Sequence, residues 1–64
     1  MNPHDEDCVV VFTFANGTII PSENMTERQA HNLMGAAQPL IAVGFILATQ
    51  LGKVNEEGRV ILAD

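Results

Sequence analysis

Apolar side chains are concentrated in two parts of this 64-residue chain, a short one near the N-terminus and a long one in the second half. Residues 8–14 (Cys-Val-Val-Val-Phe-Thr-Phe) are rich in β-branched and aromatic side chains, which favour a β-strand. Residues 29–52 contain no Asp, Glu, Lys or Arg, so most of that segment has to be hidden from water. The pattern therefore predicts an early strand and a buried element after the middle of the chain.

The early strand continues into a predicted β-hairpin. Asn16-Gly17 is the dipeptide that best tolerates the two positive φ angles of a type I′ turn, and Thr18-Ile19-Ile20 forms the returning strand. A two-residue turn pairs Phe14 with Ile19. The side chains then divide between two faces, Val10, Phe12, Phe14 and Ile19 on one and Val9, Val11, Thr13 and Ile20 on the other. Both faces are apolar, so we expect both to be at least partly covered.

A helix is predicted to follow the hairpin, because Thr26 and Gln29 have the spacing of a capping box. Apolar residues recur at helical spacing after it, at Ala30, Leu33, Met34 and Ala37. Pro39 either begins a second helix or kinks one continuous helix. Large side chains in residues 40–51 project all round a helical wheel, so we expect a helix that is buried on most sides and ends at Gly52. The alternative is a strand, because large and small side chains also alternate there.

The predicted fold is α+β, with a β-hairpin, a long helix broken at Pro39 and a C-terminal β-strand (ββαβ). Residues 55–58 (Asn-Glu-Glu-Gly) predict a turn, and residues 59–63 predict the closing strand. A right-handed crossover places that strand beside the first one and parallel to the second, which gives the sheet order two–one–three. The helix is expected to cover the face of Phe12, Phe14 and Ile19. Residues 1–7 form an acidic tail, and residues 8–64 form a single small domain.

The chain is short, and its composition limits how it can be stabilised. A single core of this size supplies only about 3–5 kcal/mol of net stability. Cys8 is the only cysteine, and one cysteine with two histidines does not complete a four-ligand zinc site. We therefore expect no metal or cofactor, and we expect the chain to be a dimer or a higher oligomer.

Eight carboxylates against three basic side chains give the chain a formal net charge of −5. This balance argues against direct binding to nucleic acid or to an anionic membrane surface, since both require clustered basic side chains. The uninterrupted apolar core at residues 40–48 is about half the roughly 20 residues that a membrane span needs. The acidic start does not resemble a signal peptide and a lone cysteine fits a reducing compartment, so we expect a cytoplasmic protein.

Residues with chemical reactivity do not form a catalytic set. Cys8 follows three carboxylates, which raise the pKa of its thiol and make it a poor nucleophile. Glu27 and His31 have the spacing of a helical i,i+4 pair, but no nucleophile or oxyanion-binding group accompanies them. We therefore expect that the protein is not an enzyme.

One stretch resembles a known group of proteins. Residues 32–41 (Asn-Leu-Met-Gly-Ala-Ala-Gln-Pro-Leu-Ile) are similar to a helical stretch, roughly N-A-R-L-I-A-A-A-P-x-L-L, of small phage-encoded proteins of unassigned role. The proline falls one position later in this chain. The resemblance implies a helix and a phage or prophage origin, and it implies no active site.

These features lead to a hypothesis of function through contact. The leading hypothesis is a small acidic non-enzymatic interaction module, a phage-type inhibitor or regulator that docks on a larger host protein. The alternative is a homo-oligomeric structural or assembly module. The candidate contact residues are two acidic clusters and one side of the first strand, namely Asp5, Glu6, Asp7, Val9, Val11, Glu56 and Glu57. Acidic contacts would make association sensitive to salt, whereas apolar contacts would not.

Overall fold

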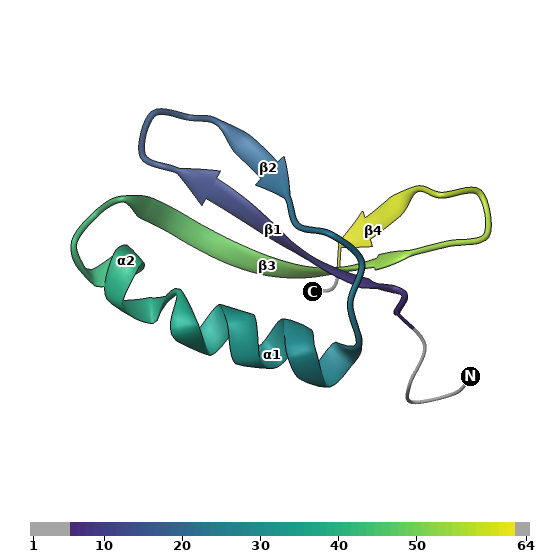
Figure 1. Ribbon diagram of the computed structural model, residues 1–64. Helices are drawn as coiled ribbons and strands as arrows, with labels where there is room; N and C mark the ends of the chain where they lie inside the picture. Colours follow the sequence, from purple (N-terminus) through teal and green to yellow (C-terminus); the bar gives the residue numbers. More distant parts are fainter. Residues whose placement is uncertain (1–5, 63–64) are drawn as a thin grey trace.

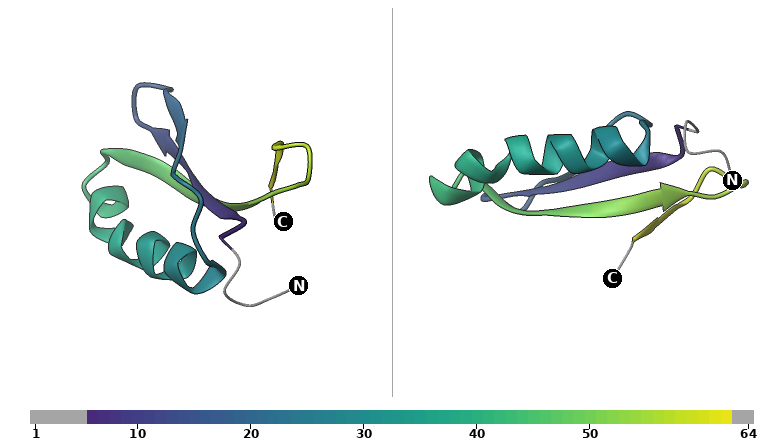
Figure 2. Two further views of the ribbon diagram at one scale, coloured as in Figure 1. Left: turned by 45° about the vertical axis from the view of Figure 1, so that its right-hand side comes forward. Right: turned by 90° about the horizontal axis from the view of Figure 1, so that it is seen from below.

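The computed structural model describes residues 6–62. In this range the elements, in chain order, are β1 (Cys8–Phe14), β2 (Ile19–Pro21), α1 (Glu27–Ala36), α2 (Gln38–Ala42), β3 (Ile46–Val54) and β4 (Val60–Leu62). The four strands form one antiparallel sheet in the order β2-β1-β3-β4. The helices lie together on one face of this sheet (Figure 1, Figure 2).

The second half of the chain corrects the predicted ββαβ fold. Residues 40–51 do not form a long helix broken at Pro39, because α2 ends at Ala42 and β3 begins at Ile46. The neighbour of β1 is β3 and not the C-terminal strand, so the predicted order two–one–three with residues 59–63 beside the first strand is wrong. The closing strand is β4, which lies outside β3 and antiparallel to it. The strand alternative for the apolar segment is the one that the structure bears out.

A C-terminal cap explains why the helix stops early. Gly44 has a φ of +86°, its N–H donates to the Ile41 carbonyl at 3.1 Å, and the Phe45 N–H donates to the Leu40 carbonyl at 3.0 Å. This pair of bonds is a Schellman motif with Gly44 at the C′ position. The glycine that ends the helix is therefore Gly44 and not Gly52, which lies inside β3. Gly52 has no room for a side chain, because a Cβ atom there would lie 2.7 Å from Cγ1 of Val60.

The β1–β2 turn has three loop residues and not two. The Gly17 N–H donates to the Phe14 carbonyl at 2.9 Å, and the Phe14 N–H donates to the Thr18 carbonyl at 2.8 Å. Among the described residues only glycines have a positive φ, and Gly17 is at +89°, so the predicted type I′ turn is wrong. The geometry fits a type I turn followed by a bulged glycine. Thr13 consequently pairs with Ile19, and this one-residue shift moves Ile19 off the helix face and Ile20 onto it.

The core lies between α1 and the first half of β1. Cys8, Val10 and Ala30 are fully buried there. Partly buried apolar side chains surround these three residues, namely Phe12, Met25, Leu33, Met34 and Leu51. The helix therefore packs on the Cys8, Val10 and Phe12 face, not on the predicted face that included Ile19.

Three local predictions are confirmed. The first strand has the predicted bounds, Cys8–Phe14. Thr26 and Gln29 form the capping box, with the Gln29 N–H donating to Thr26 Oγ1 at 3.2 Å and the Thr26 N–H donating to Gln29 Oε1 at 3.0 Å. The turn at residues 55–58 also forms, because the Gly58 N–H donates to the Asn55 carbonyl at 3.0 Å.

Candidate functional site

The single thiol lies in the core, away from any surface. Cys8 is fully buried, and its Sγ lies 3.6 Å from Oδ1 of Asp7 as a donor. Burial raises the pKa of the Cys8 thiol, and the neighbouring negative charge of Asp7 raises it further. A buried, protonated thiol is a small apolar side chain and does not act as a nucleophile at neutral pH.

The Glu27 and His31 pair lies on the outer surface of α1. His31 Nε2 is 3.7 Å from Glu27 Oε1, and both side chains are well exposed. An exposed i,i+4 pair of this kind contributes a few tenths of a kcal/mol to a helix. Within residues 6–62 no cluster of three His, Cys, Asp or Glu side chains is placed to hold a metal ion.

The two acidic clusters lie at the same end of the sheet. The Val54 N–H donates to the Asp7 carbonyl at 2.7 Å, so the start of β1 lies beside the end of β3 and the turn that carries Glu56 and Glu57. We call this end, where β1 starts and β3 ends, the acidic end. Basic side chains are interspersed there, and Arg59 Nε lies 3.8 Å from Glu57 Oε2. Asp5, the remaining predicted acidic contact, lies outside the described residues.

The predicted contact residues on β1 are less accessible than their pattern indicated. Val9 is only 2% exposed and Val11 is partly buried. A Cβ atom at Gly52 would lie 3.3 Å from a methyl group of Val9 as well as against Val60, which shows that β4 closes over the helix-free face at this point. A partner therefore cannot reach Val9 in this conformation.

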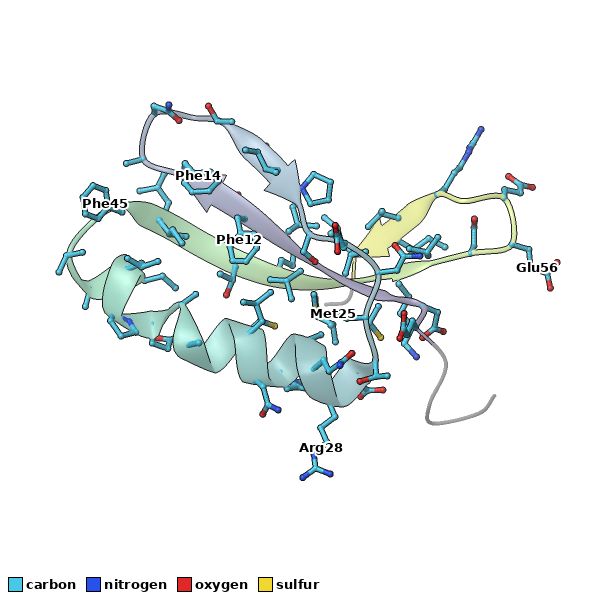
Figure 3. All side chains as sticks on the ribbon, viewed as in Figure 1. Phe12, Phe14, Met25, Arg28, Phe45 and Glu56 are labelled. Atoms are coloured by element: carbon cyan, nitrogen blue, oxygen red, sulfur yellow. The ribbon has the colours of Figure 1, made fainter. Side chains whose placement is uncertain are left out.

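The opposite end of the sheet, where β1 ends and β3 begins, has the reverse character, and we call it the apolar end. Figure 3 shows Phe14 and Phe45 at this end and Glu56 at the other. No charged residue occurs between Cys8 and Ser22 or between Gln29 and Gly52, so none comes from the elements that meet here. Four large apolar side chains of the α2–β3 region are nevertheless exposed, namely Leu40, Val43, Phe45 and Leu47.

Two adjoining hollows open on the helix side of the sheet near the apolar end, and together we call them the apolar groove. One has a volume of about 280 Å³ and only apolar lining residues: Phe12, Phe14, Leu33, Ala36, Ala37, Leu40 and Ile46. The other has a volume of about 410 Å³ and is lined by Phe14, Ala15, Asn16, Thr18, Ile20 and Phe45. Phe14 belongs to both, and its ring centroid lies 6.3 Å from that of Phe12.

Phe45 is the most conspicuous side chain of the groove, because it is exposed while its backbone is fixed. Its side chain is 68% exposed. Its N–H donates to the Leu40 carbonyl at 3.0 Å, and its carbonyl accepts from the Ala15 N–H at 3.1 Å. The first bond ties Phe45 to the end of α2, and the second ties it to the β1–β2 turn. The aromatic ring is therefore presented from a fixed position, without relying on side-chain packing to hold it.

Sequence reasoning did not find this groove. The signal that was available is Gly44, whose C′ position ends the helix and leaves Phe45 at the corner between α2 and β3. Placing the C′ glycine at Gly52 turned the same residues into a helix interior and hid them. The contribution of Ile20 depends on the one-residue register shift, which the Asn16-Gly17 pair did not indicate.

Comparisons with protein families, with curated proteins and with solved structures find no match for this chain. Within residues 6–62, no helix has the length and apolar character needed to cross a membrane.

Proposed function

We propose that this protein is a non-enzymatic interaction module that docks on a larger protein through the apolar groove, with Phe45 as the anchor. Its occupant would be an apolar, uncharged segment of that protein, because the groove carries no charged lining residue. An inhibitor or regulator of phage origin, which the resemblance of residues 32–41 implies, is the specific form of this proposal. Its setting is the cytoplasm, where a reduced thiol such as Cys8 persists.

The observation that carries the proposal is the fixed exposure of Phe45. Aromatic side chains are enriched at protein interfaces, and an anchor held in its bound position loses little conformational entropy when a partner binds. Burying one such ring contributes about 1.5–3 kcal/mol. A soluble chain gains nothing from leaving that free energy unused beside an apolar hollow, whereas a docking surface uses it.

The charge distribution supports docking by apolar contact over mimicry of a polyanion. The acidic side chains lie at the far end of the sheet from the groove, and Arg59 and Lys53 are interspersed among them. An acidic surface built to occupy a basic groove would gain from excluding those cations. The acidic end is therefore assigned to solubility, and at most to steering a partner during encounter.

The test compares one variant at each end. The tagged protein, its Phe45→Asp variant and its Glu56→Gln/Glu57→Gln variant are used to capture partners from the source cells, and the captured protein is titrated in pure form. We expect Phe45→Asp to abolish binding and Phe45→Ala to weaken it about tenfold to a hundredfold, whereas the acidic-end variant binds as the wild type does. Binding is expected to change little between low and high salt.

Stability is the control for this comparison. The Phe45 side chain is mostly exposed, so Phe45→Asp should retain the wild-type melting temperature and circular dichroism spectrum. A complex that dissociates in high salt, depends on Glu56 and Glu57 and tolerates Phe45→Asp would overturn the proposal and favour electrostatic mimicry.

A further inference from the structure

The two sides of the sheet treat their edges differently. The outer edge of β1 is covered by β2 and then by two further contacts, the Val10 N–H donating to Ser22 Oγ at 2.8 Å and the Cys8 N–H donating to the Met25 carbonyl at 2.9 Å. The outer edge of β3 is covered by β4 only at Gly52–Val54. At residues 46–49 this edge faces no other strand among residues 6–62.

The uncovered segment, Ile46-Leu47-Ala48-Thr49, lacks the features that keep an edge strand from pairing. Soluble proteins protect such edges with Pro, Lys or other charged side chains, or by making the strand very short. The β2 edge has these features, because β2 has three residues and ends in Pro21. The segment in β3 contains neither a proline nor a charge, and Leu47 is 60% exposed. The edge is therefore open to a further strand.

We propose that a second copy of this chain occupies the edge, with the two β3 strands pairing antiparallel about a two-fold axis near Ala48. Charge favours this occupant and this orientation. Each copy carries a formal net charge of −5, and the acidic turn follows the end of β3. Antiparallel pairing sends the two acidic ends to opposite extremes of the joined sheet, and the segments that meet are uncharged.

Apolar exposure favours the same arrangement. The open segment lies between two exposed apolar regions, the start of β3 with Leu47 and the end of β4 with Leu62, which pairs with Gly52. A two-fold axis through the segment brings the start of β3 in one copy next to β4 of the other. Each copy thus covers apolar surface that the other leaves exposed, as an isologous interface requires.

The backbone pattern sets the register. The Asn55 N–H donates to the Arg59 carbonyl at 2.9 Å across the outer edge of the hairpin. Because antiparallel bonding alternates from residue to residue, the backbone N–H and C=O of Thr49 also point to that edge. Pairing Thr49 with Leu47 of the second copy makes Ala48 and its counterpart a non-hydrogen-bonded pair. The Cα atoms of such a pair are about 4.5 Å apart.

This self-association is separate from docking in the apolar groove, and its test leaves the groove intact. Sedimentation equilibrium of the full chain is compared for the wild type, Leu47→Lys and Ile19→Lys. Ile19 is a matched control, because it is 63% exposed and lies on β2, away from the β3 edge. We expect a wild-type dimer, an unchanged Ile19→Lys dimer and a rise in the dimer Kd of about tenfold or more for Leu47→Lys.

A disulfide tests the register directly. Cα atoms about 4.5 Å apart lie within the range that a disulfide spans, so Ala48→Cys should oxidise to a covalent dimer. The exposed Thr18→Cys variant should not form this dimer, and neither should the wild type with its buried Cys8. A wild-type monomer at high micromolar concentration would overturn the inference. So would a dimer that Leu47→Lys leaves unchanged and that Ala48→Cys does not trap.

Discussion

At the acidic end of the sheet, Cys8, Val9 and Val10 are at most 2% exposed and charged side chains surround them, whereas at the apolar end Val43 and Phe45 are each 68% exposed with no charged neighbour from the same elements. The first arrangement is that of an ordinary soluble protein, with its apolar atoms inside and its charges outside. The second reverses it. A chain with so small a core cannot stabilise both ends by packing, so one end holds the fold together and the other is left for contact.

The largest expected effect comes from placing one carboxylate at each end. Val10→Asp puts a charge in the core without a partner, which costs several kcal/mol and exceeds the about 3–5 kcal/mol available to a core of this size. We expect that variant to be unfolded by circular dichroism. Val43→Asp should melt within a few degrees of the wild type. Equal loss of structure in both variants would show that the apolar end is also part of the core.

The two turns allow the next comparison, because Gly17 lies at the apolar end and Gly58 at the acidic end, with φ of +89° and +79°. A non-glycine residue in the left-handed region costs about 1–2 kcal/mol, and a β-branched one costs more. Gly17→Val and Gly58→Val should therefore destabilise the protein by similar amounts in urea denaturation. Unchanged stability in either variant would mean that the corresponding turn has another geometry.

A third effect appears only at alkaline pH and only at the acidic end. Burial and then the charge of Asp7 raise the pKa of the Cys8 thiol in the folded state, so the unfolded chain loses its proton first as the pH rises. The contribution to stability is complete below the ordinary thiol pKa of about 8.5 and is lost as the pH rises through the raised value. Urea midpoints measured across this range should fall for the wild type and fall less for Cys8→Ala.

Thiol reagents extend the same comparison to both ends. Cys8 in the folded wild type should react slowly, at a rate set by unfolding. A cysteine placed at the exposed Val43, in a Cys8→Ala background, should react as a free thiol does. Fast labelling of Cys8 without denaturant would contradict the packed character of the acidic end.

The smallest expected effect is at the junction of the two helices. Pro39 occupies the first turn of α2, where it replaces no backbone hydrogen bond that the helix needs. Pro39→Ala should lower stability by only about 0.4–1 kcal/mol, because the unfolded chain gains conformational freedom. A stabilised variant would instead indicate one helix running through this position.

Local chemistry made some elements predictable from the chain. Residues 8–14 form a strand because their side chains fit a pleated surface, and Thr26 caps α1 because its hydroxyl accepts the Gln29 N–H. The turn at residues 55–58 follows from Asn55, whose Oδ1 accepts from the backbone N–H of Glu57 and Arg59. None of these features depends on which strands lie side by side.

The apolar groove could not be predicted in the same way. Two of its members, Ile20 and Phe45, reach it through the bulged glycine of the first turn and the Schellman cap at Gly44. Each is a choice of one residue in position, and a shift of one residue sends a strand side chain to the opposite face. Neither choice changes the apolar pattern that the sequence presents.

The sequence by itself determined that the chain has an early strand, a capped helix and a charge-free second half that must be hidden or used for contact. Tertiary structure alone decided that residues 46–54 are a strand, because a helix and a strand satisfy the same apolar pattern until a pairing partner is available. That partner is β1, which pairs with β3 over almost its whole length. The pairing moves the C-terminal strand outward to β4 and leaves residues 46–49 at an open edge, because β4 is too short to cover it.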